Sequence, residues 1–128
     1  MEIGGFFELE LPEGQEFHKA ALRLNTGRNA FEYILRAKKY KKVFIPKYMC
    51  QVMMEPIQKL GLNYSYYRLD DNFYPLLDPA NIKKDHAFLY LNYFGLFDKQ
   101  VAKVAQKFPN LIIDNSQAFY AKPLNHRI

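Results

Sequence analysis

The chain has 128 residues, 49% of them hydrophobic, which is enough for one folded domain with a core of its own. Its single cysteine, Cys50, excludes an internal disulfide bond and a metal site built from four thiolates. The three histidines, His18, His86 and His126, share no metal-ligand spacing, so we expect no metal site.

The formal net charge is +5, and the densest basic run, RAKKYKK at 36–42, has two interpretations. It could face a phosphate-rich partner, or it could place cations at the C-terminus of a helix, where they complement the helix dipole. We favour the second, because the run lacks the aromatic series of a single-strand binding surface and no nucleic-acid reader motif occurs. We therefore expect no nucleic-acid partner.

Neither a leader peptide nor a membrane span is predicted. The opening stretch, MEIGGFFELELPEG, carries acids ahead of any apolar run, which is the opposite of the basic start of a signal peptide. The longest uncharged apolar run, AFLYLNYFGLF, is too short to cross a membrane and contains Asn92 and Gly95. We expect a cytoplasmic protein that makes no membrane contact.

The first half of the chain predicts strands and helices in alternation. FFELEL at 6–11 alternates like a half-exposed strand, and from Thr26, a plausible N-cap, the period changes to that of a helix over 28–39. KVFIP predicts a strand at 43–45. A helix follows over 49–60 and ends at Gly61, and Pro56 inside it predicts a kink or a late start.

The second half continues the alternation. NYSYYRL predicts a strand at 64–69, followed by a loop with one short helix at 79–84. Strands at 87–91 and 111–114 flank an amphipathic helix at 98–108, for which Asp98 is the expected N-cap. The strand AFLYL is apolar on both faces, which is typical of a buried parallel strand.

This order predicts one α/β domain, a parallel sheet in a three-layer sandwich. Residues 1–25 form an N-terminal strand and lead-in, and residues 26–128 form the layered part. In such sheets ligands bind outside the carboxyl ends of the strands. Three polar points fall there: the loop after Ile45, the NYFG turn after Leu91, and Asp114.

Asp114 raises a question of its own, because it follows the apolar run Leu-Ile-Ile directly. A buried carboxylate is costly unless it is paired. Asp114 is therefore either a cap for the following turn, together with Ser116, or the partner of a cation that the sequence does not contain.

Four segments resemble the DegT/StrS-type sugar aminotransferases, which are fold-type I enzymes dependent on pyridoxal phosphate. In chain order they are LNTGRNAFEYIL, IPKYMCQVM, LYLNYFGLFD and LIIDNSQAFYA, and together they span about Leu24 to Ala121. The strand with D-x-x-Q-A is the most specific of them. The resemblance implies the cofactor-binding half of a large domain over 26–128, with a small-molecule substrate, by family a nucleotide-linked sugar.

The resemblance also implies cofactor-binding residues. Asp114 takes the place of the family's Asp, which pairs with the protonated pyridine nitrogen so that the ring can serve as an electron sink. Gln117 takes the place of the residue that approaches the ring and its phenolic oxygen. NTGRNA matches the family's segment at a helix N-terminus, where backbone amides suit a phosphate. The remaining implied contacts are Gly27, Arg28, Asn29, Cys50 and Asn92.

Several positions depart from the family pattern. Arg28 replaces a small hydroxyl residue, although its guanidinium could hold a phosphate by two hydrogen bonds. Cys50 stands where the family has a stacking aromatic, two residues after Tyr48, and Asn92 stands where it has a histidine. The family's Schiff-base lysine lies well beyond D-x-x-Q, and Lys122 is too near Asp114 for that role. We expect this chain to be inactive alone, and to form a homodimer or pair with a missing C-terminal portion that covers its apolar surface.

Two alternatives stay open. The first is a non-catalytic α/β module for ligand binding or assembly, built on the same fold. The second is an unrelated Rossmann-like or flavodoxin-like binder, which is weakened because no G-x-G-x-x-G follows the first parallel strand.

Overall fold

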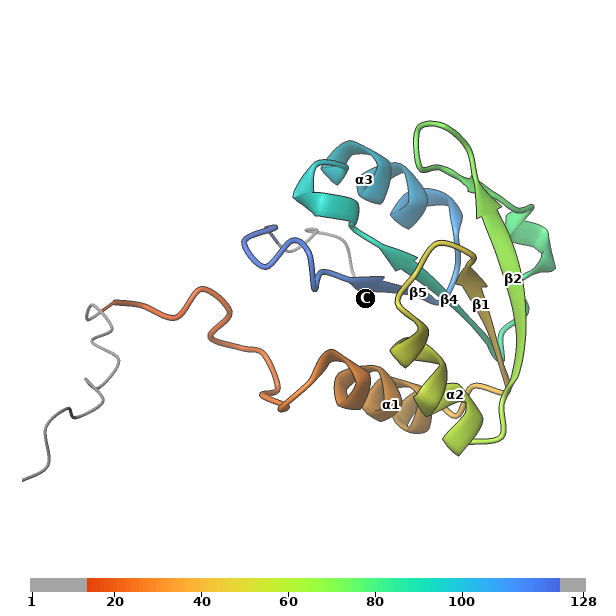
Figure 1. Ribbon diagram of the computed structural model, residues 1–128, viewed down its shortest axis with the longest axis horizontal. Helices are drawn as coiled ribbons and strands as arrows, with labels where there is room; N and C mark the ends of the chain where they lie inside the picture. Colours follow the sequence, from red (N-terminus) through yellow and green to blue (C-terminus); the bar gives the residue numbers. More distant parts are fainter. Residues whose placement is uncertain (1–13, 123–128) are drawn as a thin grey trace, which may run out of the picture.

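Figure 1 shows a computed structural model of the chain, which describes residues 14–122. The strand predicted at 6–11 lies outside this part. The elements in chain order are α1 (Gly27–Lys38), β1 (Lys42–Pro46), η1 (Gln51–Met53), α2 (Met54–Lys59), β2 (Asn63–Leu69), β3 (Pro75–Leu76), η2 (Pro79–Asn81), β4 (His86–Leu91), η3 (Tyr93–Gly95), α3 (Asp98–Lys107) and β5 (Leu111–Asp114).

The strands form one sheet in the order β3-β2-β1-β4-β5. The pairs β1–β2, β1–β4 and β4–β5 are parallel, and the sheet fans from an upright β2 to a nearly level β5 in Figure 1. The short β3 runs antiparallel to β2 through two residue pairs, Arg68↔Leu76 and Leu69↔Pro75. The predicted α/β fold with a parallel sheet is confirmed, and β3 is an unpredicted antiparallel addition.

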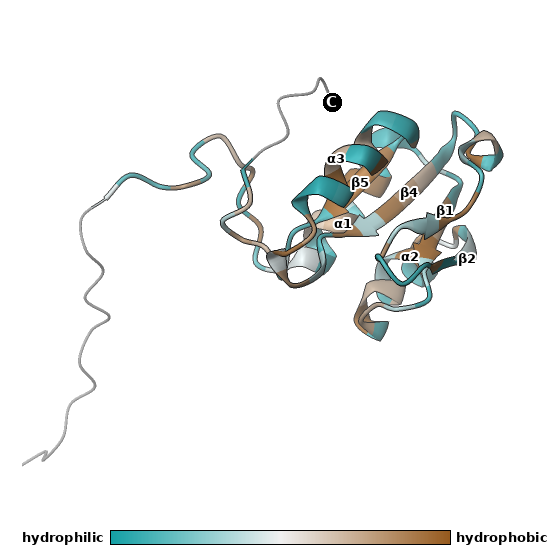
Figure 2. Cartoon of the chain, turned by 90° about the horizontal axis from the view of Figure 1, so that it is seen from above, coloured by the Kyte–Doolittle hydropathy of each residue, from teal (hydrophilic) through white to brown (hydrophobic). Residues whose placement is uncertain are grey.

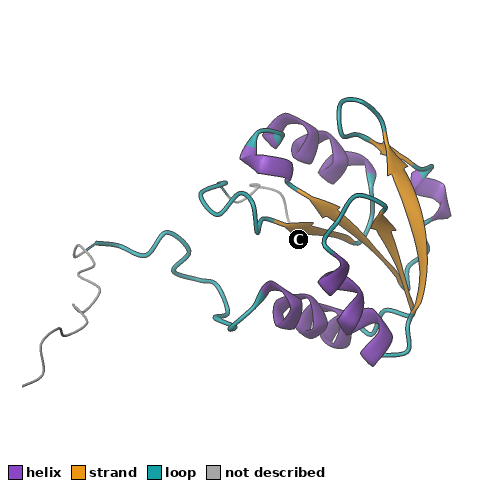
Figure 3. Cartoon of the chain, in the orientation of Figure 1, coloured by secondary structure: helices purple, strands orange, loops and turns teal. Residues whose placement is uncertain are grey.

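Helices cover both faces of the sheet, α1 and α2 on one side and α3 on the other (Figures 1 and 3). From β1 the chain crosses through α2 to β2, and from β4 it crosses through α3 to β5 on the opposite side of the sheet centre. The strand order therefore reverses between β1 and β4. At such a reversal the connecting loops diverge and leave room for a ligand outside the carboxyl ends.

The core lies between these layers. Ala87 to Leu91 of β4 are all buried, as are Val43 to Pro46 of β1, in agreement with the apolar character of these runs. Figure 2 shows hydrophobic residues in brown along the sheet. The buried residues of α1 are Phe31 and Leu35, and those of α3 are Val101 and Val104. None of the helices described in residues 14–122 has the length and apolar character needed to cross a membrane.

The helix ends confirm some sequence predictions and correct others. The Oγ1 of Thr26 accepts a hydrogen bond from the Asn29 backbone N–H at 3.2 Å, so Thr26 is the N-cap of α1. The helix predicted at 49–60 begins as an α-helix only at Met54, because Pro56 is tolerated in the first helical turn. Gly61 follows its end with a φ of 61°.

Two other ends differ from the prediction. Asp98 is the first residue of α3 and not its N-cap, and its carboxylate accepts a hydrogen bond from the Asn92 side chain at 3.0 Å. The helix predicted at 79–84 is a single 3₁₀ turn, Pro79–Asn81, because Asp78 caps Ala80 but no apolar stripe follows to extend it.

Candidate functional site

A cavity of about 470 Å³ opens at the carboxyl edge of the sheet. Its wall comes from the N-terminus of α1, the loop after β1, the end of β4 with η3, and the turn after β5. Six of the seven residues predicted from the sequence line it: Gly27, Arg28, Cys50, Asn92, Asp114 and Gln117. Segments that are far apart in the sequence thus meet where the strand order reverses.

The parallel register of β4 and β5 is what brings Asn92 next to Asp114. Leu91 pairs with Asp114 across the two strands, and the Asn92 backbone N–H donates to the Asp114 carbonyl at 3.0 Å. Both strands end at the same edge, because parallel strands present their carboxyl ends together.

Asp114 serves the turn that follows it. Its Oδ1 accepts a hydrogen bond from the Ser116 backbone N–H at 2.8 Å, which forms an Asx turn. Within residues 14–122 its other carboxylate oxygen makes no hydrogen bond, and the residue lines the cavity. The capping interpretation is therefore correct for one oxygen and leaves the second available to a ligand.

The N-terminus of α1 closes the cavity from the other side. A Cβ added at Gly27 would lie 3.3 Å from the Ser116 Oγ, so the first turn of α1 lies close against the turn after β5. The Asn29 N–H is used by Thr26, and the Ala30 N–H donates to the Thr26 carbonyl. In the described part of the chain, the amides of Gly27 and Arg28 have no acceptor. Two free amides at the positive end of a helix form a favourable position for an anion.

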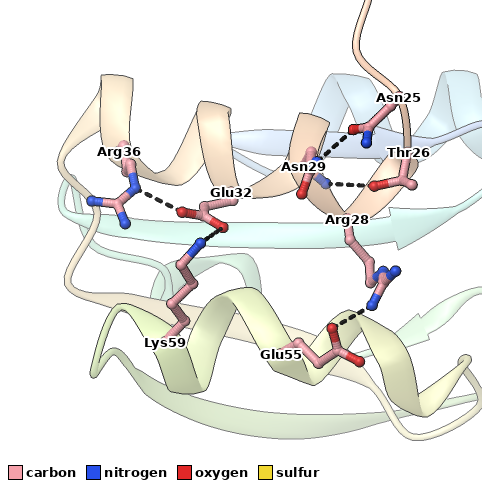
Figure 4. Close-up of polar contacts among 8 residues, drawn as sticks. All are labelled: Asn25, Thr26, Arg28, Asn29, Glu32, Arg36, Glu55 and Lys59. Atoms are coloured by element: carbon pink, nitrogen blue, oxygen red, sulfur yellow. Dashed lines mark hydrogen bonds and ion pairs between the residues drawn. The ribbon is translucent and has the colours of Figure 1, made fainter.

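Arg28 and Asn29 are engaged elsewhere (Figure 4). The Arg28 guanidinium forms an ion pair with Glu55 of α2, although the residue also lines the cavity. The Asn29 side chain donates to Asn25, and Asn29 is the one predicted residue that does not line the cavity. The structure therefore associates Asn29 with the helix cap.

Asn92 is almost completely buried, with 1% of its surface exposed. Its Nδ2 donates to Asp98 at 3.0 Å, but its Oδ1 has no donor among the described residues. A buried acceptor without a partner costs about 1–3 kcal/mol. Asn92 also lies on the cavity wall, so this oxygen is an acceptor beside the cavity that the described residues leave without a partner.

Two tyrosines give the cavity an aromatic side beside Cys50. Cys50 and Tyr48 both line the cavity, and the Tyr48 ring stacks on Tyr93 at 5.7 Å between centroids. The Tyr93 hydroxyl donates to the Tyr48 carbonyl at 2.8 Å. Burial raises the pKa of Tyr93, and nearby Tyr90, Tyr48 and Asp114 raise it further, so its hydroxyl stays protonated.

Gln117 joins two of the cavity-forming turns. Its Oε1 accepts a hydrogen bond from the Phe94 backbone N–H at 2.9 Å. A Cβ on Gly95, which has a φ of 68°, would lie 3.3 Å from the Gln117 carbonyl. Gln117 therefore shapes the site in addition to lining it.

Eight residues of the wall were not predicted as site residues: Thr26, Tyr48, Met49, Val52, Met53, Leu91, Tyr93 and Ser116. The signal for the tyrosines was present, since both stand at strand ends inside the quoted segments. Among residues 14–122, no three His, Cys, Asp or Glu side chains come together in an arrangement that could hold a metal ion.

No protein-family model matches the sequence, and no curated protein matches it. Among solved structures, the chain is similar to a "putative aminotransferase" from Burkholderia pseudomallei, with 17% sequence identity and a TM-score of 0.51. The match covers 67% of this chain and 29% of that protein. The chain therefore has an aminotransferase-like α/β fold and spans less than a third of this neighbour's length.

Proposed function

We propose that the cavity binds pyridoxal phosphate and that the chain is the cofactor-binding part of an aminotransferase of the DegT/StrS type. The observation that carries the proposal is the meeting of Asp114 with the free amides of Gly27 and Arg28 in one cavity. An anionic hydrogen-bond acceptor, the Asp114 carboxylate, and two backbone N–H donors of α1 thus line one cavity. This combination matches a ligand with a basic nitrogen and a phosphate. The aminotransferase-like fold supports the same assignment.

The residues present fit this cofactor. The positive end of α1 suits the phosphate, and Gly27 lets the first helical turn lie close to Ser116. The free carboxylate oxygen of Asp114 suits a protonated ring nitrogen. Tyr48, with 61% of its surface exposed, offers a ring face on the same wall. A volume of about 470 Å³ is in the range of small-molecule sites.

When bound, pyridoxal phosphate supplies an electron sink for carbon chemistry at the amino group of a substrate. The chain's own residues would hold and orient it. Asp114 would keep the ring nitrogen protonated, and the α1 amides would bind the phosphate. Gln117 holds the η3 turn in place through its hydrogen bond from the Phe94 N–H. The stacked pair Tyr48 and Tyr93 forms an aromatic side of the cavity.

A sugar linked to a nucleotide is the substrate class that the resemblance supports. Among the described residues, no lysine lines the cavity. We therefore propose that residues 1–128 alone bind the cofactor without a covalent link and do not catalyse transamination. Self-association of the chain, expected from the sequence, stays a prediction.

The test of the proposal is Asp114→Asn, which keeps an acceptor for the Ser116 N–H but removes the charge. We expect pyridoxal phosphate, followed by its absorbance and by equilibrium dialysis, to bind the variant at least tenfold more weakly, while the thermal midpoint changes little. Asp71→Asn serves as the control, because Asp71 is exposed and does not line the cavity. Equal cofactor affinity in wild type and Asp114→Asn would show that Asp114 is only a cap.

The absence of a lysine in the described cavity wall also favours a second candidate, a ligand-binding module without catalysis. Borohydride reduction of the chain with cofactor, followed by mass spectrometry, tests the premise that both candidates share, that residues 1–128 hold no catalytic lysine. Stoichiometric labelling of one lysine that is lost in Asp114→Ala would establish a catalytic lysine in this chain. Scattered trace labelling that Asp114→Ala leaves unchanged is the result expected for residues 1–128 alone.

A further inference from the structure

A second hollow, of about 460 Å³, lies at the same edge of the sheet, where β1 and β2 end. It is lined by Lys47, Tyr48, Arg68, Leu69, Asp70 and Phe73. Tyr48 also lines the first cavity, so the two hollows adjoin at this ring. A ligand bound in the first cavity that extends past Tyr48 would enter the second.

Two cations stand side by side in this second hollow. Pro46 pairs with Tyr67 at the end of the β1–β2 ladder, and the Lys47 backbone N–H donates to the Tyr67 carbonyl at 2.9 Å, which places Lys47 beside Arg68. Neighbouring strands are about 4.8 Å apart. Like charges in adjacent positions repel one another unless an anion lies between them.

The hollow holds one carboxylate, Asp70, against these two cations. Within the described part of the chain, neither Lys47 nor Arg68 forms an ion pair. The Asp70 Oδ1 accepts hydrogen bonds from the backbone N–H groups of Asn72 and Tyr74, each at 2.8 Å, which hold this carboxylate at the turn between β2 and β3. The side chains that line the hollow therefore carry one more positive than negative charge.

The rest of the wall is aromatic. The Phe73 ring lines this hollow and lies 6.4 Å from Tyr48 and 4.9 Å from Tyr93, measured between centroids. An apolar wall behind two cations strengthens their attraction for an anion, because it reduces the local screening by water. Phosphate groups, which carry more charge than a single carboxylate and more acceptor oxygens, suit two donors from two strands best.

We infer that Lys47 and Arg68 form a subsite for the phosphate or diphosphate group of an organic substrate. The placement of the substrate's reacting end in the first cavity rests on the proposed function, whereas the anion subsite itself does not. Lys47 and Arg68 would act as substrate-binding residues and would set a preference for phosphorylated substrates over their uncharged analogues.

The test is a titration of the full chain with inorganic pyrophosphate, followed by amide chemical shifts in nuclear magnetic resonance. We expect shifts at residues 47–48 and 68–70. The double variant Lys47→Gln with Arg68→Gln should bind about tenfold more weakly, as expected for the loss of charge-assisted hydrogen bonds. The control, Lys99→Gln with Lys103→Gln, removes the same charge from α3, lines neither hollow, and should bind as wild type does.

Several results would overturn the subsite: no binding, equal weakening in the control variant, unchanged binding in the test variant, or shifts confined to the first turn of α1. Pyridoxal phosphate titrated into the same samples separates this proposal from the proposed function. We expect equal cofactor affinity in wild type and in Lys47→Gln with Arg68→Gln. Pyrophosphate binding at residues 47 and 68 without cofactor binding would reject the cofactor site and leave the anion subsite standing.

Discussion

Arg28 stands at the rim of the first cavity with its guanidinium paired to Glu55 of α2 (Figure 4). The two side chains are 40% and 58% exposed. Exposed ion pairs contribute about 0–1 kcal/mol, so a phosphate at the α1 N-terminus can compete with Glu55 for the guanidinium. The predicted contact of Arg28 with phosphate through two hydrogen bonds therefore requires that the guanidinium leave Glu55.

Removal of the competing carboxylate should tighten phosphate binding. We expect Glu55→Gln to raise the affinity for pyridoxal phosphate about two- to fivefold, because Arg28 is released and a negative charge near the phosphate is lost. Equilibrium dialysis at low and at high salt measures this, and the gain should shrink as salt increases.

Glu32→Gln is the matched control for that variant. Glu32 lies on α1 and accepts hydrogen bonds from Lys59 and Arg36, which lower the pKa of its carboxyl group, but it does not line the cavity. An equal gain in cofactor affinity in both variants would show that the effect comes from the change in overall charge and not from the release of Arg28. No gain in Glu55→Gln would show that Arg28 does not reach the phosphate.

At the scale of elements, the η3 turn determines the shape of the cavity's outer wall. Gly95 has a φ of 68°, and its added Cβ would lie 3.3 Å from the Gln117 carbonyl. We expect Gly95→Ala to reduce the free energy of unfolding by about 1–3 kcal/mol and to weaken cofactor binding, because both the backbone and Gln117 must adjust.

Gly61→Ala separates the backbone effect from the contact. Gly61 has a φ of 61°, but a Cβ there would meet nothing within 4 Å. Chemical denaturation should show a smaller loss of stability in Gly61→Ala than in Gly95→Ala, with cofactor binding unchanged. Equal losses in both variants would mean that the Gly95 contact with Gln117 is unimportant.

The longer elements could be predicted from the sequence, and the short ones could not. Hydrophobic periodicity identifies the longer elements, as in the apolar runs of β1, β4 and β5 and the apolar stripe of α1. The bounds predicted for these elements therefore agree with the observed bounds to within a few residues. The two residues of β3 are too few for any period, and Pro75 argues against a strand. The sequence could not decide where α2 starts, because Pro56 is compatible with a kink inside a longer helix and with a place in the first turn of a shorter one.

The candidate site was predictable where it depends on strand ends, and less so where it depends on side-chain direction. Asp114 and Asn92 follow buried strands, so their place at one edge comes from parallel pairing. The sequence cannot show that Arg28 turns to Glu55, or that Tyr48 stacks on Tyr93 beside the cavity, because both depend on how loops and helices pack.

At the scale of the whole molecule, three buried tyrosines join segments of the sheet and its loops that are far apart in the sequence. The hydroxyl of Tyr67 donates to the Leu89 carbonyl, that of Tyr90 to Phe73, and that of Tyr93 to Tyr48. Burial raises the pKa of Tyr67 and Tyr93, and burial with nearby Asp70 and Tyr74 raises the pKa of Tyr90 to about 12. A phenolate could not donate these hydrogen bonds.

These shifts predict a loss of stability at high pH. The unfolded chain loses its tyrosine protons near the ordinary pKa of 10, whereas the folded chain keeps them, so the unfolded state binds fewer protons above pH 10. The free energy of unfolding should therefore be unaffected by these groups below pH 9 and should fall as pH rises from about 10 toward 12. Urea unfolding measures it, and the fall should be smaller in Tyr90→Phe. The exposed Tyr33 provides the control, because Tyr33→Phe should leave the pH profile unchanged.

The central claim is that the cavity at the carboxyl edge holds pyridoxal phosphate between α1 and Asp114. A crystal structure of the chain soaked with the cofactor tests this most directly. We expect the phosphate at the amides of Gly27 and Arg28, the ring nitrogen at hydrogen-bond distance from the Asp114 carboxylate, and no covalent bond to a lysine. Cofactor density outside this cavity, or a ring whose nitrogen points away from Asp114, would contradict the account.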